Sequence, residues 1–167
     1  MKLQFKEQDF QVNAVQAVVD CFEGQPFKTN RFTLERSKEL IQKVKQNTLA
    51  IKALDSDIEE EIGYRNSSIQ LLDTQILKNI QEIQKLNDIH ECEQIERPGK
   101  IKLGYNLTIE METGTGKTYT YIRTMYELHK KYGWSKFIVI VPSIAIREGV
   151  HKSFQVTQDH FQELYGH

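Results

Sequence analysis

The sequence predicts an α/β protein in which one parallel βαβ unit carries an inserted pair of long helices. A glycine-rich turn, residues 111–118, separates an alternating segment from an amphipathic one. A continuous apolar, β-branched run follows at residues 137–141, and such runs are typical of strands buried in a parallel sheet. Upstream, residues 34–95 contain one glycine and no proline among many Ile, Leu and charged residues, which favours long helices.

The first expected domain, residues 1–33, begins with a short amphipathic helix over residues 8–24. Its apolar side chains recur at helical spacing, and Gly24 follows as a C-terminal stop. The stripe consists of Phe10, Ala14, Val15, Val18, Val19 and Phe22. Pro26 and the polar residues up to Thr33 predict a loop.

The second expected domain, residues 34–98, is a helical hairpin. One apolar stripe begins at Ile41 and another at Ile69, with steps of mostly three and four residues. Between them, residues 63–67 predict a turn, with Asn66 or Ser67 capping the second helix. The heptads are too irregular for a dimeric coiled coil, so an antiparallel pair within one chain is favoured over a dimer.

The third expected domain, residues 99–167, holds the βαβ unit. Leu103 to Met111 alternates as a strand does, residues 117–131 have helical periodicity with Gly133 as the stop, and residues 137–141 form the second strand. A crossover of this kind is almost always right-handed.

Composition limits the classes of function. The 167 residues are 39% hydrophobic and 27% charged, with a net charge of −1, so the chain as a whole is no general polyanion binder. No apolar run is long enough to span a bilayer, and the first residues lack the apolar core of a signal peptide. A cytoplasmic protein with no membrane partner is expected, in which Cys21 and Cys92 are reduced thiols.

Residues 111–118, METGTGKT, carry the clearest chemical signal. They fit the phosphate-loop pattern GxxxxGK[ST] except that Met111 stands in the first glycine position. Gly114 and Gly116 allow the backbone N–H groups to turn inward and form an anion nest at a helix N-terminus. Lys117 would reach the β- and γ-phosphates, and the Thr118 hydroxyl would complete the Mg²⁺ shell. The plainer alternative is a glycine-rich turn that precedes a helix.

The same stretch resembles the phosphate loop of superfamily-two helicases and translocases, in which the first position is often not glycine. Residues 109–150 resemble more closely the restriction (Res) subunit of type III restriction-modification enzymes. In that family the segment VPSIAIREGV, residues 141–150, corresponds to helicase motif Ia, which lies along the DNA backbone. Gln11 with Ala14, in FQVNAV, resembles the glutamine motif that recognises adenine.

This resemblance implies half of a RecA-like lobe that binds ATP and Mg²⁺. Lys117 would be its catalytic residue, and Thr118 would contact Mg²⁺ through the nucleotide. Ser143 and Arg147 would contact double-stranded DNA. The whole protein would hydrolyse ATP and cut DNA in complex with a methyltransferase subunit. The expected nucleotide-binding residues are Gln11, Thr113, Gly114, Thr115, Gly116, Lys117 and Thr118.

Several of these residues also have plainer roles. Gln11 on a polar helix face is commonly solvated, and Ser143 is a natural N-cap for the helix after the strand. The histidines His129, His151 and His160 lack metal-ligand spacing, and Trp134 is expected to pack rather than to stack on a base.

No acidic Walker B motif, second lobe or nuclease constellation can be placed in the sequence, which predicts an inactive N-terminal part of a larger protein. Two alternatives stay open. One is another superfamily-two DNA helicase or repair translocase, which would lack the downstream nuclease. The other is a non-catalytic nucleotide- or partner-binding module whose helical pair docks another subunit.

Overall fold

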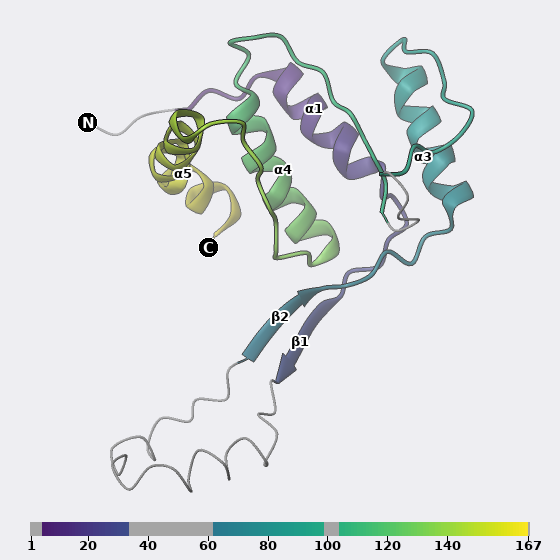
Figure 1. Ribbon diagram of the computed structural model, residues 1–167, viewed down its shortest axis with the longest axis horizontal. Coiled ribbons are helices and arrows are strands. Elements are labelled where there is room, and N and C mark those ends of the chain that lie inside the picture. The colour runs from purple at the N-terminus through teal and green to yellow at the C-terminus, as the bar shows by residue number, and fades with distance from the viewer. Residues whose placement is uncertain (1–4, 34–61, 99–103, 167) are drawn as a thin grey trace, which may run out of the picture.

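The computed structural model describes residues 5–33, 62–98 and 104–166, and within these ranges the chain forms four helices and a two-stranded antiparallel ribbon. The helices are α1 (Asp9–Asp20), α3 (Asp73–Leu86), α4 (Lys117–Tyr132) and α5 (Ile144–Tyr165). The strands are β1 (Thr29–Thr33) and β2 (Ile62–Asn66). Helix α1 packs between α3 and α4, α5 covers the other side of α4, and the ribbon projects away from the helices (Figure 1).

The predicted parallel βαβ fold, and with it the partial RecA-like lobe, is wrong for the described residues. The β1–β2 ribbon is antiparallel and pairs Thr29 with Asn66 and Thr33 with Ile62. Residues 104–111 and 135–141 run as extended chain without strand pairing. Strands need backbone partners on a neighbouring strand, and neither segment has one in the described ranges. Consequently Ile138 and Ile140, expected to be buried, are 91% and 89% exposed.

The predicted helical hairpin also changes at its centre. The turn expected at residues 63–67 is strand β2 up to Asn66, and the loop expected before Thr33 contains its partner β1. The second helix is present as α3, with Ile76 fully buried. The first helix of the pair falls at residues 34–61, outside the described residues, and the domain boundaries remain a prediction.

Helices α1 and α4 agree with the sequence prediction and share the main core. Val15 and Val19 face Leu128, Tyr132 and Trp134. The Tyr132 hydroxyl donates to the carbonyl oxygen of Val19 at 2.8 Å, which satisfies the one polar atom of a buried ring. Trp134 is a packed aromatic, as predicted, and its indole N–H donates to Ser67 Oγ at 3.1 Å.

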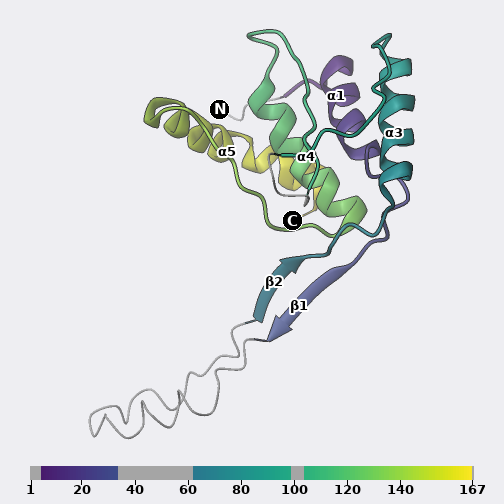
Figure 2. The ribbon, with the colours of Figure 1, turned by 45° about the vertical axis from the view of Figure 1, so that its right-hand side comes forward.

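A second core joins α4 to α5. Phe161 is fully buried, and its ring stacks on those of Tyr119 and Tyr126 at centroid separations of 5.2 and 4.9 Å. Burying a ring of this size contributes about 2 kcal/mol or more, so α5 is held on α4 chiefly by aromatic contacts. The turned view shows α5 lying across α4 (Figure 2). Within the described ranges, the helices are too short or too polar to cross a membrane.

Candidate functional site

The glycine-rich loop lies at the N-terminus of α4, as the sequence predicted, but the segment before it is not the predicted strand. Gly114 and Gly116 both have φ of +85°, a left-handed conformation that residues with a Cβ adopt only with strain. Gly116 is the N-cap of α4. The two glycines therefore bend the chain sharply at the point where the helix begins.

The first N–H groups of α4 are available at this bend. Within the described residues, the N–H groups of Gly116, Lys117 and Thr118 have no hydrogen-bond acceptor, and the first helical bond runs from Thr120 N to Gly116 O at 3.0 Å. Free N–H groups at a helix start carry the positive end of the helix dipole. The arrangement suits an anion such as phosphate.

Two side chains of the loop hydrogen-bond to the same carbonyl oxygen. Lys117 Nζ donates to Glu112 O at 2.7 Å, and Thr115 Oγ1 donates to it at 2.6 Å. The Lys117 side chain is thus folded back over the loop, although its acceptor, Glu112 O, is a neutral carbonyl and the residue is exposed. A phosphate oxygen is a stronger acceptor for an ammonium group than a carbonyl.

The remaining loop residues take different positions. Thr113 is exposed at the start of the turn, and Thr118 is half-buried in the first turn of α4 beside Lys117. The structure brings Gln11 to the same place, since its Nε2 donates to Thr115 O at 2.8 Å although 104 positions separate the two residues. Helix α1 is therefore part of the site wall.

Ser143 and Arg147 lie apart from these contacts, at the start of α5. Ser143 Oγ accepts a hydrogen bond from Ile146 N at 3.3 Å, so the predicted N-cap is confirmed. Arg147 is exposed and forms an ion pair with Glu148 at 2.9 Å. A contact of either residue with DNA stays a prediction.

Sequence reasoning missed the role of Asn66. Its amide oxygen accepts from the N–H groups of Ser135 and Lys136, both at 2.9 Å, and its Nδ2 donates to Lys136 O at 2.7 Å. Asparagine before serine resembles a helix cap, and no local signal identifies a partner 70 residues away.

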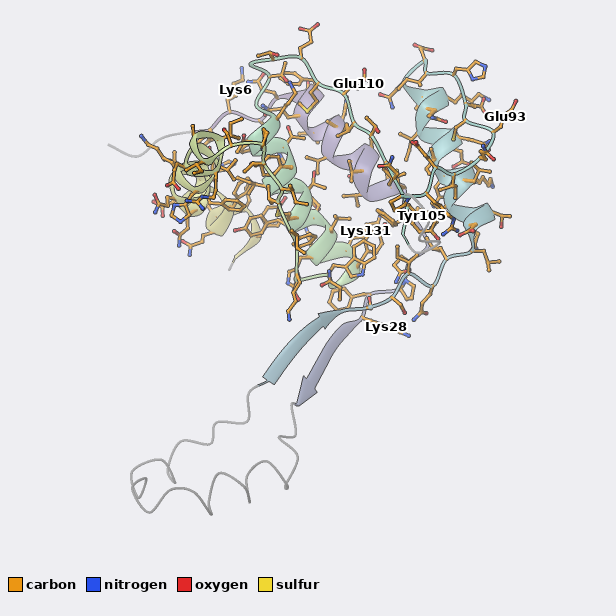
Figure 3. The ribbon with its side chains drawn as sticks, in the orientation of Figure 1. Lys6, Lys28, Glu93, Tyr105, Glu110 and Lys131 are labelled. Carbon is orange, nitrogen blue, oxygen red and sulfur yellow. The ribbon has the colours of Figure 1, made fainter. Side chains whose placement is uncertain are left out.

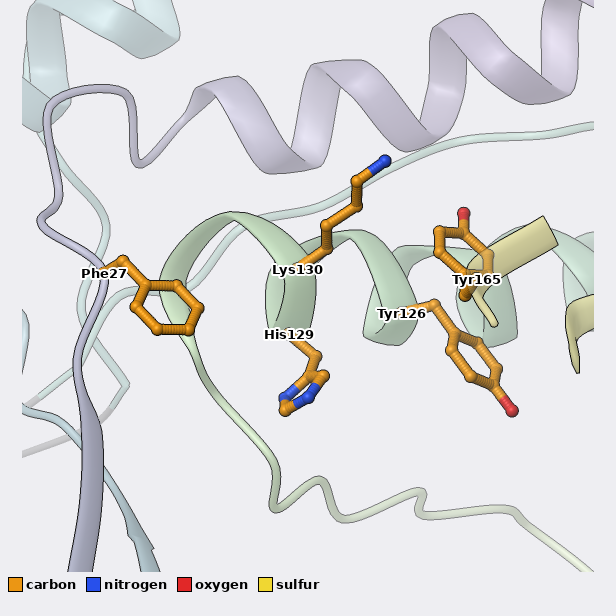
Figure 4. A pocket seen from close by; sticks show the side chains of 5 residues that line it. All are labelled: Phe27, Tyr126, His129, Lys130 and Tyr165. Carbon is orange, nitrogen blue, oxygen red and sulfur yellow. The ribbon is translucent and has the colours of Figure 1, made fainter. Parts of the chain in front are cut away.

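A shallow hollow of about 220 Å³ lies at the far end of α4 and is separate from the loop. It is lined by Phe27, Tyr126, His129, Lys130 and Tyr165 (Figure 4). Because the loop is at the N-terminus of the helix and the hollow near its C-terminus, the hollow is no part of the loop site. The described residues also contain no group of three His, Cys, Asp or Glu side chains that could hold a metal ion.

The chain matches a known family over nearly its whole length. The family described as "Type III restriction enzyme, res subunit" matches residues 4–165. The sequence is 36% identical over 107 residues to the type III restriction-modification enzyme EcoPI Res subunit of Escherichia phage P1, covering 60% of this chain and 10% of that relative. It is 36% identical over 103 residues to the EcoP15I Res subunit of Escherichia coli, with the same coverage of 60% and 10%.

A shorter stretch is more similar still. Over 62 residues the chain is 50% identical to the type III restriction-modification enzyme StyLTI Res subunit of Salmonella typhimurium, covering 36% of this chain and 6% of that relative. This chain therefore spans about a tenth of the length of the curated relatives it matches.

Proposed function

Because this chain belongs to the type III restriction enzyme Res-subunit family, we propose that residues 111–118 bind the phosphates of ATP in a DNA-dependent ATPase. The observation that carries the proposal is the set of N–H groups at Gly116, Lys117 and Thr118 that have no acceptor in the described part of the chain, with an exposed ammonium group beside them. Backbone donors at a helix N-terminus plus one lysine are the usual components of a triphosphate site.

The loop residues fit a nucleotide bound with Mg²⁺. Thr113, Gly114, Thr115 and Gly116 would wrap the phosphates, and Lys117 would release the Glu112 carbonyl to neutralise the β- and γ-oxygens. The Thr118 hydroxyl is the oxygen ligand next in sequence, and hard oxygen ligands are what Mg²⁺ takes. Mg²⁺ bound there with the nucleotide would supply positive charge that offsets the charge of the phosphates. Gln11 is assigned to the same nucleotide site.

The wider activity follows from the family and extends beyond this chain. We propose that the whole protein works in the cytoplasm as the Res subunit of a type III restriction endonuclease, coupled to a methyltransferase subunit and acting on double-stranded DNA. Ser143 and Arg147 are the residues proposed to contact DNA phosphates, since a capped helix start and a guanidinium group both suit a phosphate oxygen.

The test is Mg-ATP binding to this 167-residue chain by calorimetry, with Lys117→Ala compared with Lys130→Ala. Lys130 is an exposed lysine in the last turn of the same helix, so it controls for loss of a positive charge. We expect Lys117→Ala to weaken binding at least tenfold, since a charge-assisted bond contributes about 1.5–3 kcal/mol, and Lys130→Ala to bind normally. Equal binding by wild type and Lys117→Ala would refute the proposal.

A second expectation concerns turnover. This chain by itself should release no phosphate above background, with or without DNA, because no residue of it is assigned to activate water or to stabilise the transferred phosphoryl group. DNA-stimulated phosphate release that disappears in Lys117→Ala would contradict this expectation.

A further inference from the structure

The amide of Gln11 is held against the phosphate loop by the fold. Gln11 belongs to the first turn of α1, and α1 is fixed on α4 by the Tyr132–Val19 hydrogen bond and by the shared core in which Val15 and Val19 pack with Leu128 and Tyr132. From this anchored helix, Gln11 Nε2 donates to Thr115 O at 2.8 Å in a partly buried position. The amide donor is thus committed to the loop.

This hydrogen bond sets the direction of the next N–H group. The Thr115–Gly116 peptide is trans, as are all the described peptide bonds, and in a trans peptide the C=O and N–H groups point in opposite directions. Holding Thr115 O toward α1 therefore turns the Gly116 N–H away from α1. That N–H is one of the donors without an acceptor among the described residues.

The contact is close enough to restrict the loop. A Cβ on Gly116 would lie 2.5 Å from Gln11 Nε2, so the amide rests directly against the backbone of that glycine. Reversing the Thr115–Gly116 peptide would break the hydrogen bond and aim the Gly116 N–H at the Gln11 amide. The conformation with N–H turned away from α1 is therefore the one that Gln11 stabilises.

We propose that Gln11 is a positioning residue that presents the Gly116 N–H to phosphate, independently of the base of the nucleotide. This inference rests on the proposed function, because it refines how the same loop holds phosphate. It differs from the adenine-reading role that the sequence resemblance implies. A residue that orients the loop should contribute equally to ATP and to a triphosphate with no base.

The experiment compares Mg-ATP with Mg-tripolyphosphate by calorimetry on this chain. Gln11→Met keeps the length of the side chain and removes its donor. Gln16→Met is the matched control, since Gln16 lies exposed on the same helix and donates to Asp20 of its own helix, at 2.6 Å. We expect Gln11→Met to weaken both compounds by the same factor, about fivefold for the loss of one hydrogen bond. Gln16→Met should bind both as wild type does.

Two binding results would overturn the proposal. Weaker binding of ATP with unchanged binding of tripolyphosphate would overturn the proposal in favour of adenine reading, and unchanged binding of both would overturn it outright. The backbone amide of Gly116, followed by nuclear magnetic resonance without nucleotide, gives a readout that does not need binding. Its chemical shift should move in Gln11→Met but not in Gln16→Met.

If wild type binds neither compound, the proposed function fails. The nuclear magnetic resonance signal of the Gly116 amide, compared between wild type and Gln11→Met, still tests the positioning role. An amide signal that is identical in wild type and Gln11→Met would overturn it. Equal thermal unfolding midpoints for the two methionine variants, within about 2 °C, would exclude a general loss of stability as the cause of weaker binding.

Discussion

Helix α4 has a glycine with a left-handed backbone conformation at each end, and the two ends serve different purposes. Gly116 at the N-terminus has φ of +85°, and Gly133 at the C-terminus has φ of +77°. At the N-terminus, the N–H groups of Gly116, Lys117 and Thr118 have no acceptor among the described residues. At the C-terminus, Gly133 N donates to His129 O at 2.8 Å.

The C-terminal end is joined to both strands of the ribbon. Lys28 N, just before β1, donates to Tyr132 O at 3.3 Å, and Trp134 Nε1 donates to Ser67, just after β2. Asn66, the last residue of β2, adds its three bonds to residues 135 and 136. Lys28 lies where the chain enters the ribbon, close to the α4 end that carries Lys131 (Figure 3).

Hydrogen-bond pairing separates the structural end of α4 from the end proposed to bind an anion. Buried or tightly packed polar groups that are all paired stabilise a structure, whereas unpaired donors gathered at a helix start are available to an anion. Residue type alone does not distinguish the two ends, because both are glycine turns with lysine beside them. Hydrogen-bond pairing does distinguish them.

The largest loss of stability is expected from a substitution of Gly133, at the C-terminal end of α4 that is joined to the ribbon. A Cβ there would lie 2.7 Å from the Lys28 backbone oxygen, and the positive φ adds strain. Gly133→Ala should lower the free energy of unfolding by about 3 kcal/mol. Gly166→Ala is the control, because Gly166 ends α5 with φ of +73° and open space around it. It should cost only the strain, about 1 kcal/mol.

Urea titration of the two alanine variants measures both values. Equal losses at Gly133 and Gly166 would mean that the close approach to Lys28 contributes nothing. The close packing of Gly133 against Lys28 would then not be what stabilises the C-terminal end of α4.

The next effect comes from Asn66. Asn66→Ala removes three hydrogen bonds that tie the ribbon to residues 135 and 136, and it should lower the free energy of unfolding by about 2 kcal/mol. Asn87→Ala is the matched change, since the exposed Asn87 donates one side-chain bond to Ile83 O at 2.8 Å. It should cost about 0.5 kcal/mol. A loss at Asn66 no larger than that at Asn87 would show that the ribbon is not held through this residue.

Local features of the fold could be predicted from the sequence. The apolar stripe of α1, the span of α4, the Ser143 cap and the stop at Gly133 all depend on residues within one or two helical turns. The glycine turn before α4 could be predicted for the same reason, since its glycines and Lys117 are adjacent in the chain, and its binding of phosphate stays a prediction.

Features that depend on distant residues could not be predicted. The strands TNRFT and IGYRN are short and mostly polar, and their pairing joins segments about 30 residues apart. The run at residues 137–141 indicated a buried strand, but burial requires neighbouring strands, and the described residues supply none. The Gln11 contact with Thr115 likewise exists only once α1 packs on α4.

The smallest loss of stability is expected from removing the charge of Lys131, near the C-terminal end of α4. Burial disfavours the Lys131 ammonium group, but hydrogen bonds from it to Glu23 and Asp20 outweigh burial and raise the pKa of Lys131 above its ordinary 10.5. The partners are partly exposed, with the Asp20 side chain at 37% and that of Glu23 at 61%, so solvent screens the pairs and Lys131→Met should cost only about 0.5 kcal/mol. It should leave Mg-ATP and tripolyphosphate binding unchanged, because this lysine lies at the scaffold end of α4.

The sign of its pH dependence follows from linkage. The folded chain keeps the Lys131 proton to higher pH than the unfolded chain does, so the stabilisation is fully present below pH 10.5 and is lost as the pH rises through the folded pKa. Burial also raises the pKa of Tyr132, from 10.0 to about 12, while the neighbouring Lys131 ammonium lowers it, so the Tyr132 hydroxyl would titrate differently in wild type and in Lys131→Met. The quantity to measure is therefore the difference in unfolding free energy between Tyr132→Phe and the double variant Tyr132→Phe with Lys131→Met, at pH 7, 9 and 11.5. A difference that is constant from pH 7 to 9 and smaller at 11.5 is expected. A difference that grows with pH, or a weaker affinity for tripolyphosphate in Lys131→Met, would contradict the assignment of scaffold and binding roles to opposite ends of the helix.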